Sequence, residues 1–160
     1  MKIGVVSDTH SYAIPQQLLD DFKKVDMIIH AGDFCSVNDL KLFKKIKEVR
    51  AVFGNMDGLE VRQILPEKVI FQIEDVKIGL CHGHGSPDKV PKIVRTEFKR
   101  DKIHVAIFGH SHYPLNETIN GVLYFNPGSP NDLVRAPYCS YGILDISHGQ
   151  VIAKIIKVKE

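Results

Sequence analysis

Short apolar runs alternate with amphipathic stretches through the first third of the chain. Three of these runs have the length and composition of buried strands, namely Lys2–Val6, Met27–Ile29 and Arg50–Phe53. The segments between them, Pro15–Lys24 and Val37–Lys47, repeat apolar residues with the period of a helix. Proline suits the first turn of one helix, and a Ser36 cap suits the other. This β-α-β-α-β order predicts parallel strands joined by right-handed crossovers.

Strand-like runs dominate the rest of the chain. They cover residues 69–73, 77–81, 104–108, 115–119, 122–125, 141–146 and 150–158. Short polar turns separate three pairs of them, and Asn120-Gly121 is typical of a hairpin. Ser86-Pro87 predicts the start of one more helix, which continues to about Arg100. We therefore expect two sheets with helices outside, and no repeat or linker divides residues 1–160 into more than one domain.

The composition is that of an ordinary globular protein, with 44% hydrophobic and 25% charged residues. A net charge of only +2 argues against a nucleic-acid polymer or a membrane surface as partner. The chain also has no apolar run near the ~20 residues of a membrane span, and its start lacks a signal peptide, so we expect a cytoplasmic location. The three widely spaced cysteines predict free thiols rather than a disulfide framework.

Polar side chains follow five of the predicted strands at their carboxyl ends. The segments are Asp8-Thr9-His10, Gly32-Asp33, Gly54-Asn55-Met56-Asp57, His82-Gly83-His84 and Gly109-His110-Ser111-His112. Ligands of open α/β sheets bind beyond the carboxyl ends of strands, so these five segments are expected to converge on one site. The glycines before Asp33, Asn55 and His110 permit close backbone approach and sharp turns.

The residue types in these segments indicate a metal centre. Asp, His and Asn offer oxygen and nitrogen donors without thiolate, which suits Mn, Fe, Ni, Co or Zn better than calcium. Each motif alone also has an ordinary explanation: Asp8 and Asp33 occur in turns, Asn55 suits a left-handed turn, and His82 suits a hydrogen-bonded core position. Their joint occurrence at five strand ends favours the metal site.

The order of these motifs resembles that of the calcineurin-like metallophosphoesterase superfamily. The order is Asp-x-His, Gly-Asp, Gly-Asn-x-Asp, Gly-His and Gly-His-x-His. The short length and the opening Ser7-Asp8-Thr9-His10 are similar to its small bacterial and archaeal phosphodiesterase branch. The resemblance covers roughly residues 1–130. It implies an α/β (α+β) fold, a four-layer αββα sandwich of two mixed β-sheets flanked by helices.

The resemblance also implies two divalent metal ions, of which manganese and nickel are candidates. By this resemblance the first metal would be bound by Asp8, His10 and His112, and the second by Asn55, His82 and His110. Asp33 would bridge the two metals. Such a pair, ~3.5–4 Å apart, shares a water and lowers its pKa, which supplies hydroxide to attack phosphorus. The candidate catalytic residues are Asp33, Asn55 and His84, and His84 either faces the phosphate or makes a loop hydrogen bond.

One position departs from the family pattern. Many members have a histidine after Gly-Asn, where this chain has Met56, and a thioether cannot donate a proton. Hence esters with good leaving groups should be cleaved best. We expect Asp57 to orient a neighbouring metal-ligand histidine. His30 is expected to lie beside the site or in the core. The turn Asn126–Ser129 either supports the ligand loops or is a simple turn.

The leading hypothesis is a binuclear metal-dependent phosphodiesterase acting on small phosphate esters. A phosphomonoesterase of the same fold, and a non-catalytic scaffold like the retromer subunit that shares it, stay open as alternatives. A nuclease is disfavoured because the chain is short and nearly neutral. The terminal strands offer edges through which copies of the chain could form a homo-oligomer.

Overall fold

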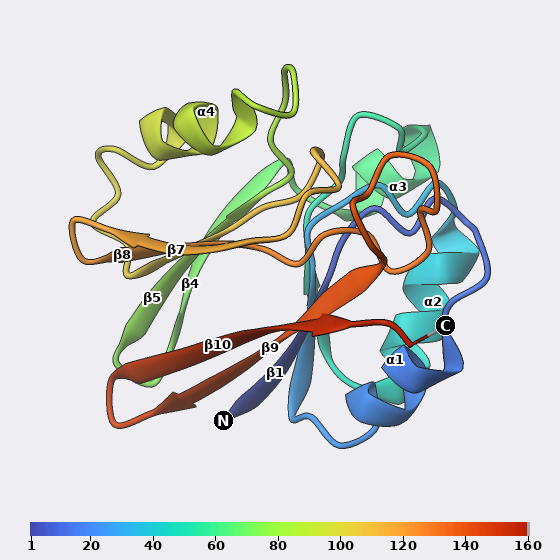
Figure 1. Cartoon of the computed structure of the whole chain (residues 1–160), viewed down its shortest axis with the longest axis horizontal. Coiled ribbons are helices and arrows are strands. Elements are labelled where there is room, and N and C mark those ends of the chain that lie inside the picture. The colour runs from blue at the N-terminus through green and yellow to red at the C-terminus, as the bar shows by residue number, and fades with distance from the viewer. Residues whose placement is uncertain (160) are drawn as a thin grey trace.

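Two five-stranded sheets lie face to face at the centre of the molecule (Figure 1). The computed structural model describes residues 1–159. The first sheet has the order β10-β9-β1-β2-β3 and contains β1 (Lys2–Val6), β2 (Met27–His30), β3 (Val49–Ala51), β9 (Ser140–Ser147) and β10 (Gln150–Lys157). The second has the order β4-β5-β6-β8-β7 and contains β4 (Lys68–Ile73), β5 (Val76–Cys81), β6 (Val105–Ile107), β7 (Leu115–Ile119) and β8 (Val122–Asn126).

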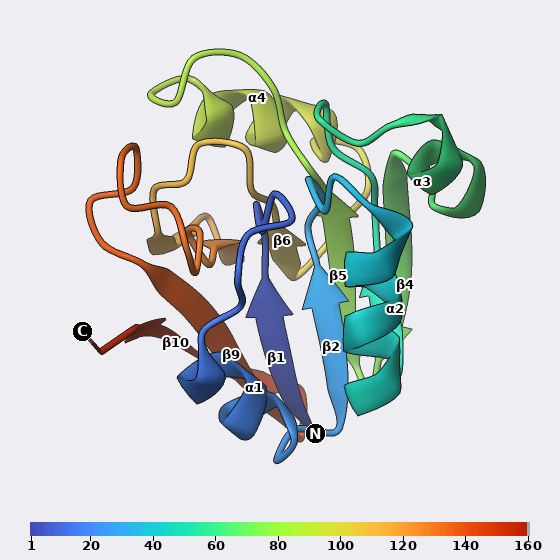
Figure 2. The same cartoon turned by 90° about the vertical axis from the view of Figure 1, so that its right-hand side faces the viewer.

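Both sheets are mixed, as predicted. In the first, β1, β2 and β3 are parallel, with Ile3 opposite Met27, and β9 and β10 are antiparallel additions. In the second, β5, β6 and β8 are parallel, and β4 and β7 are antiparallel edge strands. Figure 2 shows β1, β2 and β5 running toward the same end of the molecule. The loops that follow these strands therefore meet at one edge of the sandwich.

Helices cover the outer face of each sheet. They are α1 (Gln16–Phe22), α2 (Val37–Ile46), α3 (Leu59–Ile64) and α4 (Val90–Glu97). Helices α1 and α2 pack on the first sheet through buried Phe22 and Phe43 (Figure 2), and α4 packs on the second through Val94 (Figure 1). Between the sheets, side chains such as Ile29 and Ile107 are fully buried. These layers confirm the αββα sandwich.

Two helix predictions needed correction. Helix α4 begins at Val90 and ends at Glu97, because Ser86 forms a turn with Lys89 and Pro91, rather than Pro87, occupies the first helical turn. Helix α3 lies between two of the predicted strands, in a segment for which the sequence pattern predicted no helix. The Ser36 cap of α2 is confirmed, since its hydroxyl accepts a hydrogen bond from the Asp39 amide at 3.3 Å.

The three cysteines are free thiols. Within residues 1–159, no helix has both the length and the apolar character needed to cross a membrane.

Candidate metal centre

The seven predicted ligands all lie at the edge where the carboxyl ends of the parallel strands meet. The loop after β1 supplies Asp8 and His10, and the loops after β2 and β3 supply Asp33 and Asn55. From the second sheet, His82 follows β5, and His110 and His112 follow β6. Side chains that are up to 104 positions apart in the sequence thus meet in space, which is the convergence predicted from the strand pattern.

Asp8, His10 and His112 form one tight group. The Asp8 Oδ1 atom lies 3.3 Å from His112 Nε2 and 3.8 Å from His10 Nε2. The two Nε2 atoms lie 3.2 Å from each other. These three atoms can therefore all reach a single cation placed between them.

A second group surrounds His82. Its Nε2 atom lies 3.2 Å from Asp33 Oδ2 and 3.1 Å from Asn55 Oδ1, and His110 Nδ1 lies 2.9 Å from the same asparagine oxygen. Asp33 Oδ2 is also 3.8 Å from His10 Nε2, so this carboxylate lies between the two groups. Asp8 contributes to both groups, because its Oδ1 atom is 3.8 Å from His82 Nε2.

The Asp8 Oδ1 atom gives the clearest sign that a cation belongs here. The side chain is fully buried, and this oxygen has no hydrogen-bond partner within residues 1–159. A buried carboxylate oxygen without a partner is costly, and a cation bound between it and the imidazoles of His10 and His112 would remove that cost. The nitrogen and oxygen donors fit a divalent transition metal.

The protein also fixes which ring nitrogen each histidine turns toward the site. His82 Nδ1 donates to the carbonyl of Ala31 at 2.7 Å, which leaves Nε2 for a ligand. His112 Nδ1 bonds to the Asp132 carboxylate. Such partners orient a metal-binding imidazole and raise its basicity. Asp132 was missed in the sequence because it lies in the loop after β8, far from any of the five motifs.

The remaining two histidines have different partners. His110 Nε2 faces the Gly85 carbonyl at 2.9 Å, so Nδ1 is the atom turned toward Asn55. His10 Nδ1 faces the sulfur of Cys35 at 3.4 Å. Burial, followed by the nearby Asp33 carboxylate, raises the pKa of that thiol to about 11, which keeps it protonated at neutral pH.

The carboxylate and imidazole charges perturb one another strongly. Burial alone would raise the pKa of Asp8, but His82 and then His112 outweigh it and hold that pKa at about 2. Burial alone would lower the pKa of His82, but Asp8 and then Asp33 raise it to about 9. The pKa of His112 is raised by Asp8 in the same way, against the effect of burial. Without metal, protons on these imidazoles therefore balance the buried carboxylates.

Asp57 has a different role from the one expected. It was expected to orient a histidine, but its buried carboxylate accepts hydrogen bonds from three backbone amides instead. Its Oδ2 atom accepts from Asp33 at 2.9 Å and from Gly54 at 2.8 Å, and its Oδ1 atom accepts from Cys35 at 2.7 Å. Asp57 therefore ties the loop after β2 to the loop after β3, and so fixes Asp33 relative to Asn55.

Backbone strain is concentrated at the site. Five of the seven predicted ligands have positive φ angles, between 48° and 66°: Asp8, His10, Asp33, His110 and His112. Residues other than glycine rarely adopt these backbone angles, which cost about 1–3 kcal/mol of conformational strain per residue. Such strain is typical of functional sites. The glycines before the ligands are needed for space, because a Cβ on Gly54 would lie 2.1 Å from Asp33 Oδ1 and one on Gly109 would lie 1.9 Å from Ser7 Oγ.

The turn after β8 supports the ligand loops, as one of the two sequence interpretations proposed. Asn126 Nδ2 donates to the Gly109 carbonyl at 2.9 Å, and Ser129 Oγ donates to the Asp8 carbonyl at 2.9 Å. His30 is fully buried and stacks on Phe34, with burial lowering its pKa to about 3, so it is a neutral core residue beneath the site.

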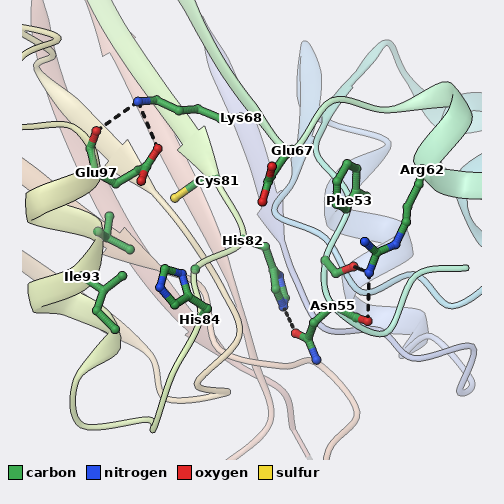
Figure 3. A pocket seen from close by; sticks show the side chains of 13 residues that line it. Phe53, Asn55, Arg62, Glu67, Lys68, Cys81, His82, His84, Ile93 and Glu97 are labelled. Atoms are coloured by element: carbon green, nitrogen blue, oxygen red, sulfur yellow. Dashed lines mark hydrogen bonds and ion pairs between the residues drawn. The ribbon is translucent and has the colours of Figure 1, made fainter.

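A pocket of about 420 Å³ opens beside the second group (Figure 3). In Figure 3, Asn55 and Arg62 lie on one side of the pocket, and His84 and Ile93 lie on the other, with His82 between them. His84 is exposed in the pocket wall and is not part of either ligand group, so the structure brings it next to the site but not into it.

A family model matches the sequence that builds this site. The model of the calcineurin-like phosphoesterase superfamily domain matches residues 1–149. The chain belongs to the calcineurin-like phosphoesterase superfamily. The phosphoesterase domain therefore extends over residues 1–149 of the 160-residue chain.

Among its relatives, a probable metallophosphoesterase of Methanocaldococcus jannaschii is 38% identical over 165 residues, which cover 100% of this phosphoesterase and 83% of the relative. The structure of an archaeal phosphodiesterase has a TM-score of 0.79 at 27% identity, covering 98% of this chain and 100% of that one. The wild-type Vps29 of Entamoeba histolytica complexed with Zn²⁺ has a TM-score of 0.78 at 26% identity, covering 98% and 99%.

Proposed function

We propose that this phosphoesterase is a metal-dependent phosphodiesterase that binds two divalent cations at the edge of its two sheets. The observation that carries the proposal is the buried Asp8 Oδ1 atom, which has no hydrogen-bond partner within residues 1–159 and lies within 3.8 Å of three imidazole nitrogens. Membership of the family and the names of the relatives, metallophosphoesterase and phosphodiesterase, support the hydrolysis of phosphate esters.

The proposed ligands divide between two positions. The first metal would be held by Asp8, His10 and His112, and the second by Asn55, His82 and His110. Asp33 would bridge them, in keeping with the position of its Oδ2 atom between His10 and His82. A carboxylate suits a bridge because it offers two oxygens and a negative charge. We propose Mn²⁺ and Ni²⁺ as the first ions to test, since both accept mixed imidazole and carboxylate donors.

A bound metal pair would supply a water of lowered pKa and neutralise charge on the phosphate. The side chains of the protein do the rest. Asn55 Oδ1 faces His82 and His110, so its Nδ2 group is free to donate to a phosphate oxygen. His84, exposed in the pocket wall, can donate a hydrogen bond to the phosphate or to the leaving oxygen.

Met56 favours substrates with good leaving groups over esters whose leaving oxygen must be protonated. Met56 is 58% exposed and its side chain has no proton to give, while its amide donates to Asp33 Oδ1 at 2.8 Å. The pocket beside Asn55 and His82 would receive one of the two esterified groups of a diester.

The proposal is tested by assaying chelator-treated protein after reloading with Mn²⁺, Ni²⁺, Fe²⁺, Co²⁺ or Zn²⁺. The substrates are bis(p-nitrophenyl) phosphate, a diester, and p-nitrophenyl phosphate, a monoester. We expect no turnover without metal and faster turnover of the diester with at least one ion. Full activity of the metal-free protein, or inertness of every metal-loaded form on both substrates, would contradict the proposal, and a preference for the monoester would make the chain a phosphomonoesterase.

Asp33→Asn separates catalysis from folding in the same assay. Because the bridging charge is lost, turnover should be nearly abolished while the circular dichroism spectrum stays that of the unsubstituted protein. An Asp75→Asn variant, in an exposed turn between β4 and β5, removes the same charge away from the site and should keep its activity.

A further inference from the structure

A second hollow lies on the far side of α4 from the catalytic pocket. It has a volume of about 450 Å³ and is lined by residues of α4, of the segment after α4 and of the β7–β8 hairpin. Figure 1 shows α4 above this hairpin. Four cationic side chains line it, Lys92, Arg95, Lys99 and Lys102, and we call it the basic groove. These residues recur every three or four positions, so one face of α4 and the turn after it present them together.

The charges of the basic groove are not neutralised by the protein. None of its four cations forms an ion pair within residues 1–159, and no Asp or Glu side chain lines it. Glu117 of β7 is in register with Tyr124, which lines the groove, but Glu117 is not one of the lining residues. By contrast, Lys68 at the catalytic pocket does form ion pairs, with Glu97 at 3.3 Å and with Asp101 at 2.9 Å. Four unpaired cations in one hollow produce a local positive field in a chain whose net charge is only +2.

The other lining groups suit an anion as well. Thr96 and Asn120 bring a hydroxyl and an amide that can donate hydrogen bonds. The floor is built by Phe98 and Tyr124, which are nearly buried, and the guanidinium of Arg95 lies 6.0 Å from the centre of the Tyr124 ring. Phe98 and Tyr124 thus place apolar surface next to the cations of the groove.

The basic groove is separate from the proposed catalytic site. Ile93, Val94 and Glu97 line the catalytic pocket from the opposite face of α4, and no residue lines both hollows. None of the seven proposed metal ligands contributes to the groove. The groove therefore lies outside the proposed catalytic site.

We propose that the basic groove binds a small anion that carries two or more phosphate charges. Lysine and arginine bind phosphate through charge-assisted hydrogen bonds, and four of them exceed what one monoanion needs. The hollow extends only between α4 and the β7–β8 turn, and the chain as a whole has 21 basic against 19 acidic residues. A long nucleic acid would need a basic track that continues beyond the groove, so the ligand is a small molecule.

The test uses methylenediphosphonate, a diphosphate that cannot be hydrolysed, with zinc-loaded protein and excess Mg²⁺ to prevent extraction of the bound metal. Binding is measured by calorimetry, and its place by amide shifts in NMR spectra. We expect the shifts to fall on residues 92–103 and 119–124. Shifts confined to residues 82–84 and 109–112 would mean that the probe binds only the metal centre, and the proposal would be wrong.

Paired substitutions test the charges themselves. Lys92→Gln with Lys99→Gln should weaken binding by about ten- to a hundredfold, because two charge-assisted contacts are lost. Lys41→Gln with Lys45→Gln makes the same charge change on exposed positions of α2 and should alter the affinity by less than twofold. All four positions are exposed, so both variants should fold, and the dispersion of the NMR spectrum verifies this.

Equal affinity of the two double variants would overturn the proposal. So would a single-stranded oligonucleotide that binds the groove far more tightly than the diphosphonate, since the ligand would then be a polymer. Neither result affects the proposed phosphodiesterase activity, which depends on the other face of α4 and on the metal ligands.

Discussion

Replacing Asp57 by Asn tests whether one buried carboxylate holds the two halves of the metal centre in place. Asp57 is 3% exposed, and its oxygens accept amide hydrogen bonds from Asp33, Gly54 and Cys35. Asparagine keeps the shape of the side chain but has only one acceptor oxygen. If that oxygen takes the place of Oδ2, the bonds from Asp33 and Gly54 survive, and the Cys35 amide faces an NH₂ group.

The size of the effect follows from these contacts. A hydrogen bond to a charged group contributes about 1.5–3 kcal/mol, and a neutral one contributes about 1 kcal/mol. The variant loses one charged bond outright and converts two others to neutral bonds. We therefore expect the free energy of unfolding to fall by about 2.5–7 kcal/mol. A domain of ordinary stability, about 5–15 kcal/mol, stays folded over most of that range. The affinity for zinc should fall as well, because Asp33 and Asn55 are no longer fixed relative to each other.

The assay is urea denaturation of the chelator-treated protein, followed by zinc titration of the folded variant. Asp75→Asn provides the control, because Asp75 is exposed and its carboxylate makes no hydrogen bond within residues 1–159. A loss below 1 kcal/mol in the Asp57 variant, or a loss equal to that of the control, would refute the tie between the two loops. Unchanged zinc affinity would refute its importance for the metal centre.

The remaining predictions concern three individual residues: Asp132, His82 and Met56. Asp132→Asn should lower the affinity for metal by about ten- to a hundredfold in a competition titration, because His112 loses the carboxylate that orients it, and an unchanged affinity would exclude this role. Metal must displace a proton from His82, whose pKa is about 9, so the apparent affinity should rise by up to about tenfold per pH unit and level off above pH 9. Since that pKa is raised above its ordinary value of 6.5, the same group stabilises the metal-free protein below pH 6.5, and this contribution is lost as the pH rises through 9. Met56→His should increase turnover of esters with poor leaving groups, measured across substrates of graded leaving-group pKa, and equal rates across that series would show that proton donation at this position is not limiting.

The convergence of the candidate ligands could be predicted from the sequence because each of their motifs is a local signal. Each follows a buried strand, and parallel strands bring their carboxyl ends to a common edge, so residues as distant as Asp8 and His112 are placed together by topology alone. The glycine before Asn55 also had a readable cause, since a side chain at Gly54 would collide with Asp33.

The partners of the ligands could not be predicted in the same way. Asp132 reaches His112 from a long loop whose path depends on contacts such as Asn131 Nδ2 to the Thr9 carbonyl, at 3.0 Å. Asp57 stands two residues after Asn55, a spacing that fits a histidine partner as well as the backbone amides it binds. The basic groove likewise combines α4 with a hairpin about 20 residues later, and the sequence shows those lysines only as scattered charges.

The number of metal ions bound per chain tests the two-metal centre most directly. Chelator-treated protein is titrated with Mn²⁺ or Zn²⁺, freed of excess ion and analysed for metal by mass spectrometry, alongside Asp33→Asn and Asp75→Asn. The proposed centre predicts two ions per chain in the unsubstituted protein and in the Asp75 variant, and fewer than two in the Asp33 variant. A content of one ion or none in the unsubstituted protein, under conditions in which it hydrolyses the diester, would contradict the assignment of seven ligands to two metals.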